Sequence, residues 1–137
     1  PMSSPLHTER VPLRWSDMDA LGHVNNATYF TYCETARMGL FDALDLASYE
    51  GNVGPVVAKV SCTFKEQLKY PATLSIPVTC TRVGNTSFTL TYALHRLQGE
   101  EPEVAAVCEG ESVVVWIDFE TGRPVPLPDT LRKALEG

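Results

Sequence analysis

Hydrophobic and polar residues alternate with a period of two over most of the second half of the chain, which predicts β-strands. The clearest run is 87–96, where Phe88, Leu90, Tyr92 and Leu94 share one face and polar residues alternate with them. A similar pattern, rich in β-branched residues, predicts four further strands, at 7–15, 53–65, 72–83 and 104–117.

One long segment, 27–46, has helical periodicity instead. Apolar residues recur there at spacings of three and four, and polar residues fill the opposite face. The side-chain oxygen of Asn25 or Asn26 can cap its N-terminus. A short C-terminal helix, 130–135, is expected to be capped by Asp129. The apolar face of the long helix consists of Tyr29, Cys33, Ala36, Leu40 and Leu44.

The order of elements is therefore one strand, one long helix and four consecutive strands, which predicts an α+β fold. Strands joined by hairpins pair antiparallel, and Gly84-Asn85 marks one tight turn. Pro12 places the first strand near an edge or a bulge. A single helix covers only one face of such a sheet, so the antiparallel sheet should curl around it. The other face or an edge then needs a partner, and we expect a homodimer or tetramer.

Composition limits the possible functions. The chain has 137 residues, 44% of them hydrophobic, which fits a single domain over 1–137. A net charge of −6 without a basic stretch argues against nucleic acid or an anionic membrane as partner. With no signal peptide and no apolar run of the ~20 residues that a membrane span needs, we expect a cytoplasmic protein. The cysteines, none of them in a C-x-x-C pair, are expected to be apolar filler rather than metal ligands: Cys33, Cys62, Cys80 and Cys108.

The turn between the first strand and the long helix concentrates reactive side chains. Asp17, Asp19, His23, Asn25 and Asn26 fall within ten residues, directly before the helix. A helix N-terminus offers unpaired N–H groups and a partial positive charge, which can bind a developing oxyanion. A carboxylate beside it can attack a carbonyl carbon or activate water. These residue types are also common in turns and caps that serve only the backbone, so composition alone leaves both interpretations open.

The string RWSDMDALGHVNNATYFTYCETAR, Arg14–Arg37, resembles the signature of hotdog-fold acyl-CoA thioesterases of the hydroxybenzoyl-CoA thioesterase type. Its H-V-N-N portion also resembles the plant acyl-ACP thioesterases. The likeness extends over nearly the whole chain, from about residue 7 to 135, and includes the order of elements. It implies a hotdog fold, in which a curled sheet wraps one central helix. It also implies hydrolysis of acyl-CoA without a metal or other cofactor.

The resemblance assigns roles to the turn residue by residue. Asp19, the second acid of the pair, matches the family's catalytic carboxylate and would act as nucleophile or as general base. Asp17 would support the turn, and we count it with Asn25 among the substrate-binding residues. The oxyanion hole implied by the family is the backbone N–H of Asn26, with that of Val24 or Asn25.

Two further positions call for comparison with the family. His23 matches the family's histidine, but Leu21 replaces the asparagine of the plant-type pattern, so we expect His23 to position the site. Glu34 lies on the helix, where a different hotdog branch carries its carboxylate. An ion pair with Arg37, three residues later, is the simpler expectation for it.

The sequence offers few candidates for contacts with the CoA and acyl portions of the substrate. Lys65 and Arg82 are the candidates for the phosphates of CoA. An apolar tunnel lined by Tyr29, with Phe30 and Cys33, would hold the acyl group between helix and sheet or across a subunit interface. Two alternatives to acyl-CoA hydrolysis remain, an acyl-carrier-protein thioesterase and a hotdog module that binds acyl ligands without chemistry.

Overall fold

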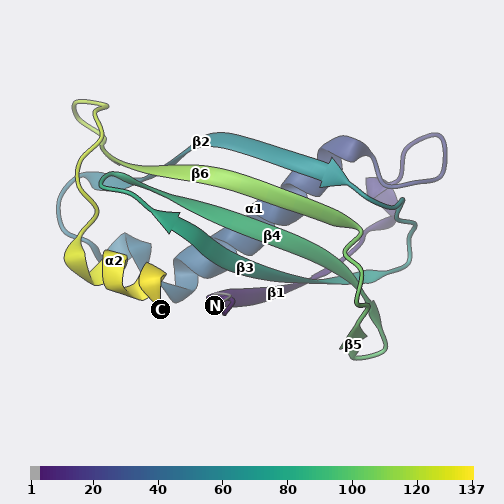
Figure 1. The fold of residues 1–137 in the computed structure, drawn as a ribbon. Coiled ribbons are helices and arrows are strands. Elements are labelled where there is room, and N and C mark those ends of the chain that lie inside the picture. The colour runs from purple at the N-terminus through teal and green to yellow at the C-terminus, as the bar shows by residue number, and fades with distance from the viewer. Residues whose placement is uncertain (1–3) are drawn as a thin grey trace.

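A computed structural model describes residues 4–137 as one antiparallel sheet with a long helix, α1, packed along one face (Figure 1). This confirms the predicted α+β class and the hotdog arrangement of a sheet around one helix. In the described part of the chain, no helix is long and apolar enough to cross a membrane. The elements are β1 (His7–Pro12), η1 (Trp15–Asp17), α1 (Asn26–Ala43), η2 (Leu46–Ser48), β2 (Val53–Phe64), β3 (Thr73–Val83), β4 (Ser87–Gln98), β5 (Glu101–Pro102), β6 (Cys108–Asp118) and α2 (Asp129–Glu136).

The strand order is β1-β3-β4-β6-β2, and the two-residue β5 pairs with β4. β1 is an edge strand, as Pro12 predicts. The four later strands are not a simple series of hairpins, however, because β2 pairs with β6 at the opposite edge from β1. The connection from β2 to β3, residues 65–72, is too long for a tight hairpin and crosses from one side of the sheet to the other.

The core lies between α1 and the sheet face that packs against it, here called the inner face. Tyr29, Cys33, Ala36 and Leu40 are buried as predicted, whereas Leu44 lies just past the helix end and is half-buried. The alternation predicted for 87–96 is confirmed, because Phe88, Leu90, Tyr92 and Leu94 are all buried.

A glycine lets α1 approach the sheet closely. Gly110 of β6 lies between Cys62 of β2 and Tyr92 of β4 in the sheet register. A Cβ atom at Gly110 would fall 2.9 Å from the sulfur of Cys33 on α1, which is closer than atoms pack. Burial raises the pKa of the Cys33 thiol, so this cysteine is a neutral filler of the interface.

Several predicted boundaries differ from the structure. α1 ends at Ala43 rather than at residue 46. β1 ends at Pro12 rather than at residue 15, because Trp15–Asp17 forms a turn of 3₁₀ helix. β6 begins at Cys108 rather than at 104, and Val104 is 98% exposed in the preceding loop. Asp129 was expected to cap α2, but Pro128 is the N-cap residue and Asp129 lies in the first turn. There its negative charge still interacts favourably with the positive end of the helix dipole.

Candidate active site

Asp17 anchors the turn that precedes α1. Its carboxylate is buried and accepts hydrogen bonds from the Arg14 N–H (2.9 Å), the Arg14 guanidinium (3.0 Å) and the Tyr32 hydroxyl (2.8 Å). Burial alone would raise the pKa of Asp17, but these donors and the positive charge of Arg14 lower it below its ordinary value. Asp17 is therefore ionised at neutral pH and ties the turn to the helix through Tyr32.

Asp19 is held in a different way. Its Oδ1 accepts hydrogen bonds from the N–H groups of Leu21 (2.9 Å) and His23 (3.4 Å), and its own N–H donates to the His23 carbonyl (2.8 Å). Gly22 closes this loop with a φ of 83°, a conformation that favours glycine. Within the described chain, no donor to Oδ2 is found. One carboxylate oxygen is thus fixed by the loop while the other stays available.

The helix N-terminus offers one uncommitted donor. The N–H groups of Val24 and Asn25 donate to backbone carbonyls at 2.9 and 3.1 Å, and that of Ala27 donates to the Asn25 side chain at 2.9 Å. Asn25 is therefore the N-cap, one of the two residues predicted for that position. Over residues 4–137, only the N–H of Asn26 in this group of four has no acceptor. Val24 and Asn25 cannot donate to an oxyanion without losing these bonds.

Asp19 and the start of α1 line one pocket of about 550 Å³, here called the Asp19 pocket. Its far wall comes from the end of β2 and the connection that follows it. Six of the eight predicted site residues line this pocket: Asp19, His23, Asn25, Asn26, Tyr29 and Lys65. The other lining residues are Leu21, Val24, Phe64, Glu66 and Gln67.

The two remaining predicted residues lie elsewhere. Asp17 is buried beneath the turn and does not line the pocket. Arg82 lines a separate hollow beside the C-terminal residues of α2, at the other end of β3 from Thr73. Lys65 lines the pocket, but its ammonium group lies 3.1 Å from the Glu109 carboxylate. A single chain therefore brings one of the two predicted phosphate ligands to the turn.

Sequence reasoning missed Tyr32 and the wall formed by Glu66 and Gln67. Tyr32 follows Tyr29 by three residues on the buried face of α1, a spacing that would have marked it as a neighbour of the turn. Tyr29 itself donates a long hydrogen bond, 3.5 Å, to the carbonyl of Glu66. Nothing in the local pattern indicates that residues 66–67 cross beneath the helix start.

Glu34 pairs with Arg37 as predicted, with 4.0 Å between Oε2 and Nη2. The Glu34 side chain is exposed, whereas Arg37 is buried and donates to the Tyr92 hydroxyl at 3.4 Å. Tyr92 and Ser112 share a further hydrogen bond of 2.7 Å. This buried chain of polar groups satisfies Arg37 beneath the sheet and does not reach the Asp19 pocket.

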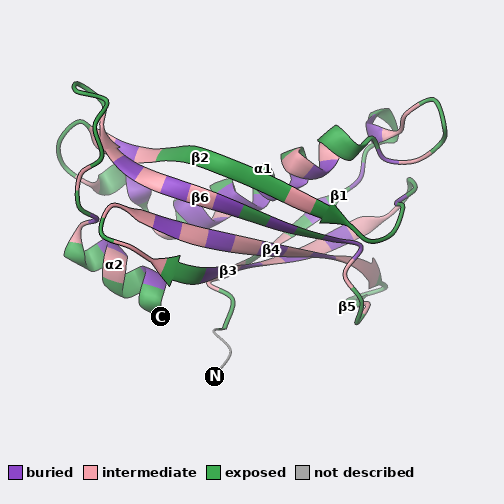
Figure 2. Cartoon of the chain, turned by 45° about the horizontal axis from the view of Figure 1, so that its top comes forward, coloured by how far each residue is buried: buried purple, intermediate pink, exposed green. Residues whose placement is uncertain are grey.

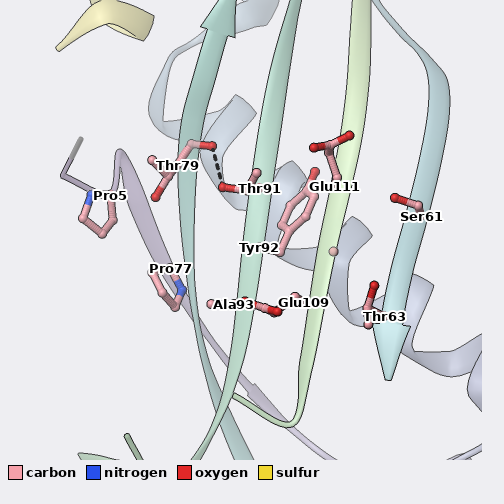
Figure 3. Close-up of a pocket in the computed structure, with 11 residues that line it drawn as sticks. Pro5, Ser61, Thr63, Pro77, Thr79, Thr91, Tyr92, Ala93, Glu109 and Glu111 are labelled. Atoms are coloured by element: carbon pink, nitrogen blue, oxygen red, sulfur yellow. Dashed lines mark hydrogen bonds between the residues drawn. The ribbon is translucent and has the colours of Figure 1, made fainter. Parts of the chain in front are cut away.

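A third hollow, of about 500 Å³, lies on the outer face of the sheet, away from α1 (Figure 3). It is lined mainly by hydroxyl groups and by two carboxylates, and the Thr91 hydroxyl donates to the Thr79 carbonyl at 3.5 Å. No predicted site residue lines it. Across residues 4–137, no group of three or more potential metal ligands is found either there or elsewhere.

Comparison with known proteins gives consistent results. A sequence profile of the thioesterase-like superfamily matches residues 13–135. The chain is 33% identical to the uncharacterized protein YsmA from Bacillus subtilis (strain 168), over 92% of this chain and 82% of that protein. It is 25% identical to the chloroplastic acyl-acyl carrier protein thioesterase ATL3 from Arabidopsis thaliana, over 94% and 67%.

A solved structure is similar over its full length. The PA2801 protein from Pseudomonas aeruginosa is 36% identical and superposes with a TM-score of 0.86, covering 96% of this chain and 98% of its own. The range matched by the superfamily profile contains every residue that lines the Asp19 pocket.

Proposed function

Since the chain belongs to the thioesterase-like superfamily, we propose that it hydrolyses acyl-CoA thioesters to free CoA and a carboxylic acid, with Asp19 as the reacting carboxylate. We assign it to the hydroxybenzoyl-CoA thioesterase type, which the Arg14–Arg37 string resembles. No cofactor takes part in this proposal. The chemistry rests on one carboxylate and one helix terminus.

The arrangement of Asp19 carries the proposal. One of its oxygens is fixed by two backbone N–H groups, no donor to the other is found among the described residues, and Asp19 and Asn26 line the same pocket. A carboxylate with this freedom beside an uncommitted helix N–H is suited to acyl transfer. If the polar side chains of this turn only formed hydrogen bonds with the backbone, no pocket would be needed beside them.

The proposed reaction has two stages. The carbonyl oxygen of the thioester accepts a hydrogen bond from the N–H of Asn26, where the helix dipole stabilises the developing negative charge. Asp19 then attacks the carbonyl carbon and forms a mixed anhydride, or it removes a proton from a water molecule that attacks instead. The C–S bond breaks and CoA leaves as a thiolate. On the anhydride route, water then cleaves the anhydride, which releases the acid and restores the Asp19 carboxylate. On either route, the water molecule supplies one oxygen to the products and the proton that converts the thiolate to the thiol. His23 lies at the pocket wall and would position the thioester.

Substitution of Asp19 tests this role. Asp19→Asn keeps the size of the side chain and should lower kcat by about 10²- to 10⁴-fold, the usual contribution of a reacting carboxylate. Thiol release from a series of CoA esters, acetyl to palmitoyl with benzoyl and phenylacetyl, provides the assay.

Asp118→Asn is a matched control, because Asp118 also accepts hydrogen bonds from the N–H groups two and three residues later, far from the pocket. Its turnover should equal that of the wild type. Full activity of Asp19→Asn would remove Asp19 as the reacting group.

A carrier-protein thioester is the second candidate substrate. The similarity to an acyl-acyl carrier protein thioesterase favours it. Both substrates present the same phosphopantetheine arm, so kcat/KM should be measured for one acyl group on CoA and on a carrier protein. A preference of tenfold or more for the carrier protein would replace our first choice.

A further inference from the structure

One ion pair lies on the boundary between the Asp19 pocket and the hollow on the outer face of the sheet. Lys65 lines the Asp19 pocket, and Glu109 lines the outer hollow. The Nζ atom of Lys65 and the Oε1 atom of Glu109 are 3.1 Å apart, and the two side chains are 48% and 58% exposed. The pair is therefore in contact with solvent at the rim of the Asp19 pocket.

The register of the sheet sets this contact. β6 alternates buried residues with exposed or half-buried ones along its length (Figure 2), and Glu109 and Glu111 are its exposed positions. Glu109 is paired with Thr63 of β2, and both line the outer face (Figure 3). Lys65 follows Thr63 by two residues and so continues on the same side of the sheet. Its N–H donates to the Val107 carbonyl at 2.9 Å, which fixes the backbone of the lysine beside Glu109.

Carboxylates outnumber basic groups in this region. Among residues 4–137, the Lys, Asp and Glu side chains that line the two hollows are one lysine and four acids: Lys65, Asp19, Glu66, Glu109 and Glu111. Arg82 lines a different hollow, beside α2. The whole chain has a net charge of −6. Because like charges oppose association, an anionic group gains affinity here only through a lysine that is free to bind it.

A CoA thioester has two parts that differ in charge. The pantetheine arm next to the sulfur is uncharged and carries amide groups, whereas the diphosphate and the ribose phosphate beyond it are anionic. With the thioester carbonyl at the N–H of Asn26, the arm lies in the Asp19 pocket and the phosphates lie beyond its rim. Lysine is a common partner for phosphate. At this rim, however, the charge of Lys65 is already neutralised by Glu109.

We infer that Glu109 is a specificity-determining residue. By holding Lys65, it prevents the site from gaining affinity from the phosphates of CoA, so that thioesters are selected through the uncharged pantetheine arm. Lys65 contacts the phosphates only when the ion pair opens. This inference rests on the proposed hydrolysis, and it names the substrate class as pantetheine thioesters, whatever group ends the arm.

The exposure of the pair limits the size of the effect. A ligand that must break an exposed ion pair loses up to about fivefold in affinity, which is about 1 kcal/mol. Salt screens interactions between exposed charges. Any contribution of Lys65 to phosphate binding should therefore be visible at low salt and fade at high salt.

The first test compares leaving groups. The acyl group that the wild type hydrolyses fastest as a CoA ester is prepared on CoA and on pantetheine, which has the same arm without the phosphates. The two values of kcat/KM should agree within about threefold, at low and at high salt. A preference for the CoA ester of about tenfold or more would show that the phosphates are recognised, and would overturn the inference.

The second test frees Lys65. Glu109→Gln keeps the shape of the side chain and removes its charge, so the ratio of kcat/KM for acyl-CoA to that for acyl-pantetheine should rise about two- to fivefold at low salt. Glu111→Gln is the matched control, because Glu111 is exposed on the same strand and face and has no ion pair within residues 4–137. It loses the same charge and should keep the wild-type ratio.

A double variant shows whether the gain passes through the lysine. Lys65→Met keeps the apolar stem and removes the ammonium group, so Lys65→Met combined with Glu109→Gln should show no rise. A rise that persists in the double variant would mean that Glu109 acts through its own charge, and the inference would fail. It would also fail if Glu109→Gln left the ratio unchanged or if Glu111→Gln raised it equally.

These failures differ from failure of the proposed function. In each of them the wild type still hydrolyses thioesters, and only the role of Glu109 is lost. Absence of hydrolysis of every thioester by the wild type would remove the proposed function and this inference together.

Discussion

Two carboxylates that stand two residues apart have different environments in this turn. Asp17 is buried and receives donors from Arg14 and Tyr32, so it is a fixed structural charge. Asp19 is half-buried, receives backbone donors on one oxygen and keeps the other free. Environment rather than residue type therefore separates the structural acid from the carboxylate that we propose to react.

The bond from Tyr32 to Asp17 should support both stability and geometry. Tyr32→Phe removes a buried hydroxyl that donates to a charged group, a loss of about 1.5–3 kcal/mol in the free energy of unfolding. Because the turn then loses its tie to α1, kcat for the preferred ester should fall by up to about 10²-fold. Urea denaturation and steady-state kinetics measure the two effects.

Tyr49→Phe provides the matched control, because its hydroxyl accepts a hydrogen bond from Thr130 at the surface, 3.2 Å long. It should change the free energy of unfolding by less than about 0.5 kcal/mol. Equal losses in the two variants would mean that the buried bond has no special role.

The lowered pKa of Asp17 predicts the pH dependence of stability. In the unfolded chain this carboxyl titrates near its ordinary pKa of about 3.9, and in the folded chain it titrates at lower pH. The unfolded state therefore binds the proton more tightly between the two values. The stabilisation is complete above the unfolded pKa and is lost as pH falls through the folded one.

Asp17→Asn should remove that part of the pH dependence. Denaturant midpoints between pH 2.5 and 7 should fall more steeply below about pH 4 in the wild type than in the variant. Parallel curves for the two proteins would contradict the assignment of a depressed pKa to Asp17.

At the scale of elements, α1 packs closely against the sheet because Gly110 of β6 has no side chain at the contact. The sulfur of Cys33 occupies the space where Gly110 has no Cβ, and Tyr92 closes the same space from β4. A larger residue at Gly110 would have to push the helix away from the strand. The closeness of helix and sheet thus depends on a glycine in the middle of a strand.

A double-mutant cycle tests this contact. Gly110→Ala should lower the free energy of unfolding by about 1–3 kcal/mol, the usual cost of overpacking a core. Cys33→Ala removes the sulfur atom that the new methyl group would meet. Added to Gly110→Ala, it should recover part of the loss, with a coupling of about 1 kcal/mol in urea denaturation. Strictly additive losses would show that the two residues do not meet.

Periodicity identified the elements well because it reports which side chains face the core. The buried sets on α1 and β4 follow directly from it. It failed at 104–107, where a valine that suits a strand stands in an exposed loop, since propensity does not say whether a pairing partner is present. It also does not say which strand is the neighbour, so the separation of β2 from β3 could not be foreseen.

At the scale of the whole molecule, the part of the candidate site that comes from neighbouring residues of one turn could be predicted from the sequence. Asp19, His23, Asn25 and Asn26 come together because one turn leads into one helix. Lys65 reaches the same pocket only because the connection after β2 passes beneath the helix start. Arg82 lies at the wrong end of β3, and the strand order that puts it there is a property of the complete sheet.

The place of β2 in the sheet also affects how the chain folds as it is made. Its residues pair with β6 residues that follow 44 (108 − 64) to 65 (118 − 53) positions later. At the usual rates of synthesis, β6 is synthesised roughly 2–13 s after the β2 residues with which it pairs. Pairing over such sequence distances is also slow. The nascent chain therefore exposes both edges of an apolar strand for seconds, and chaperone supply and growth temperature should control its yield in cells.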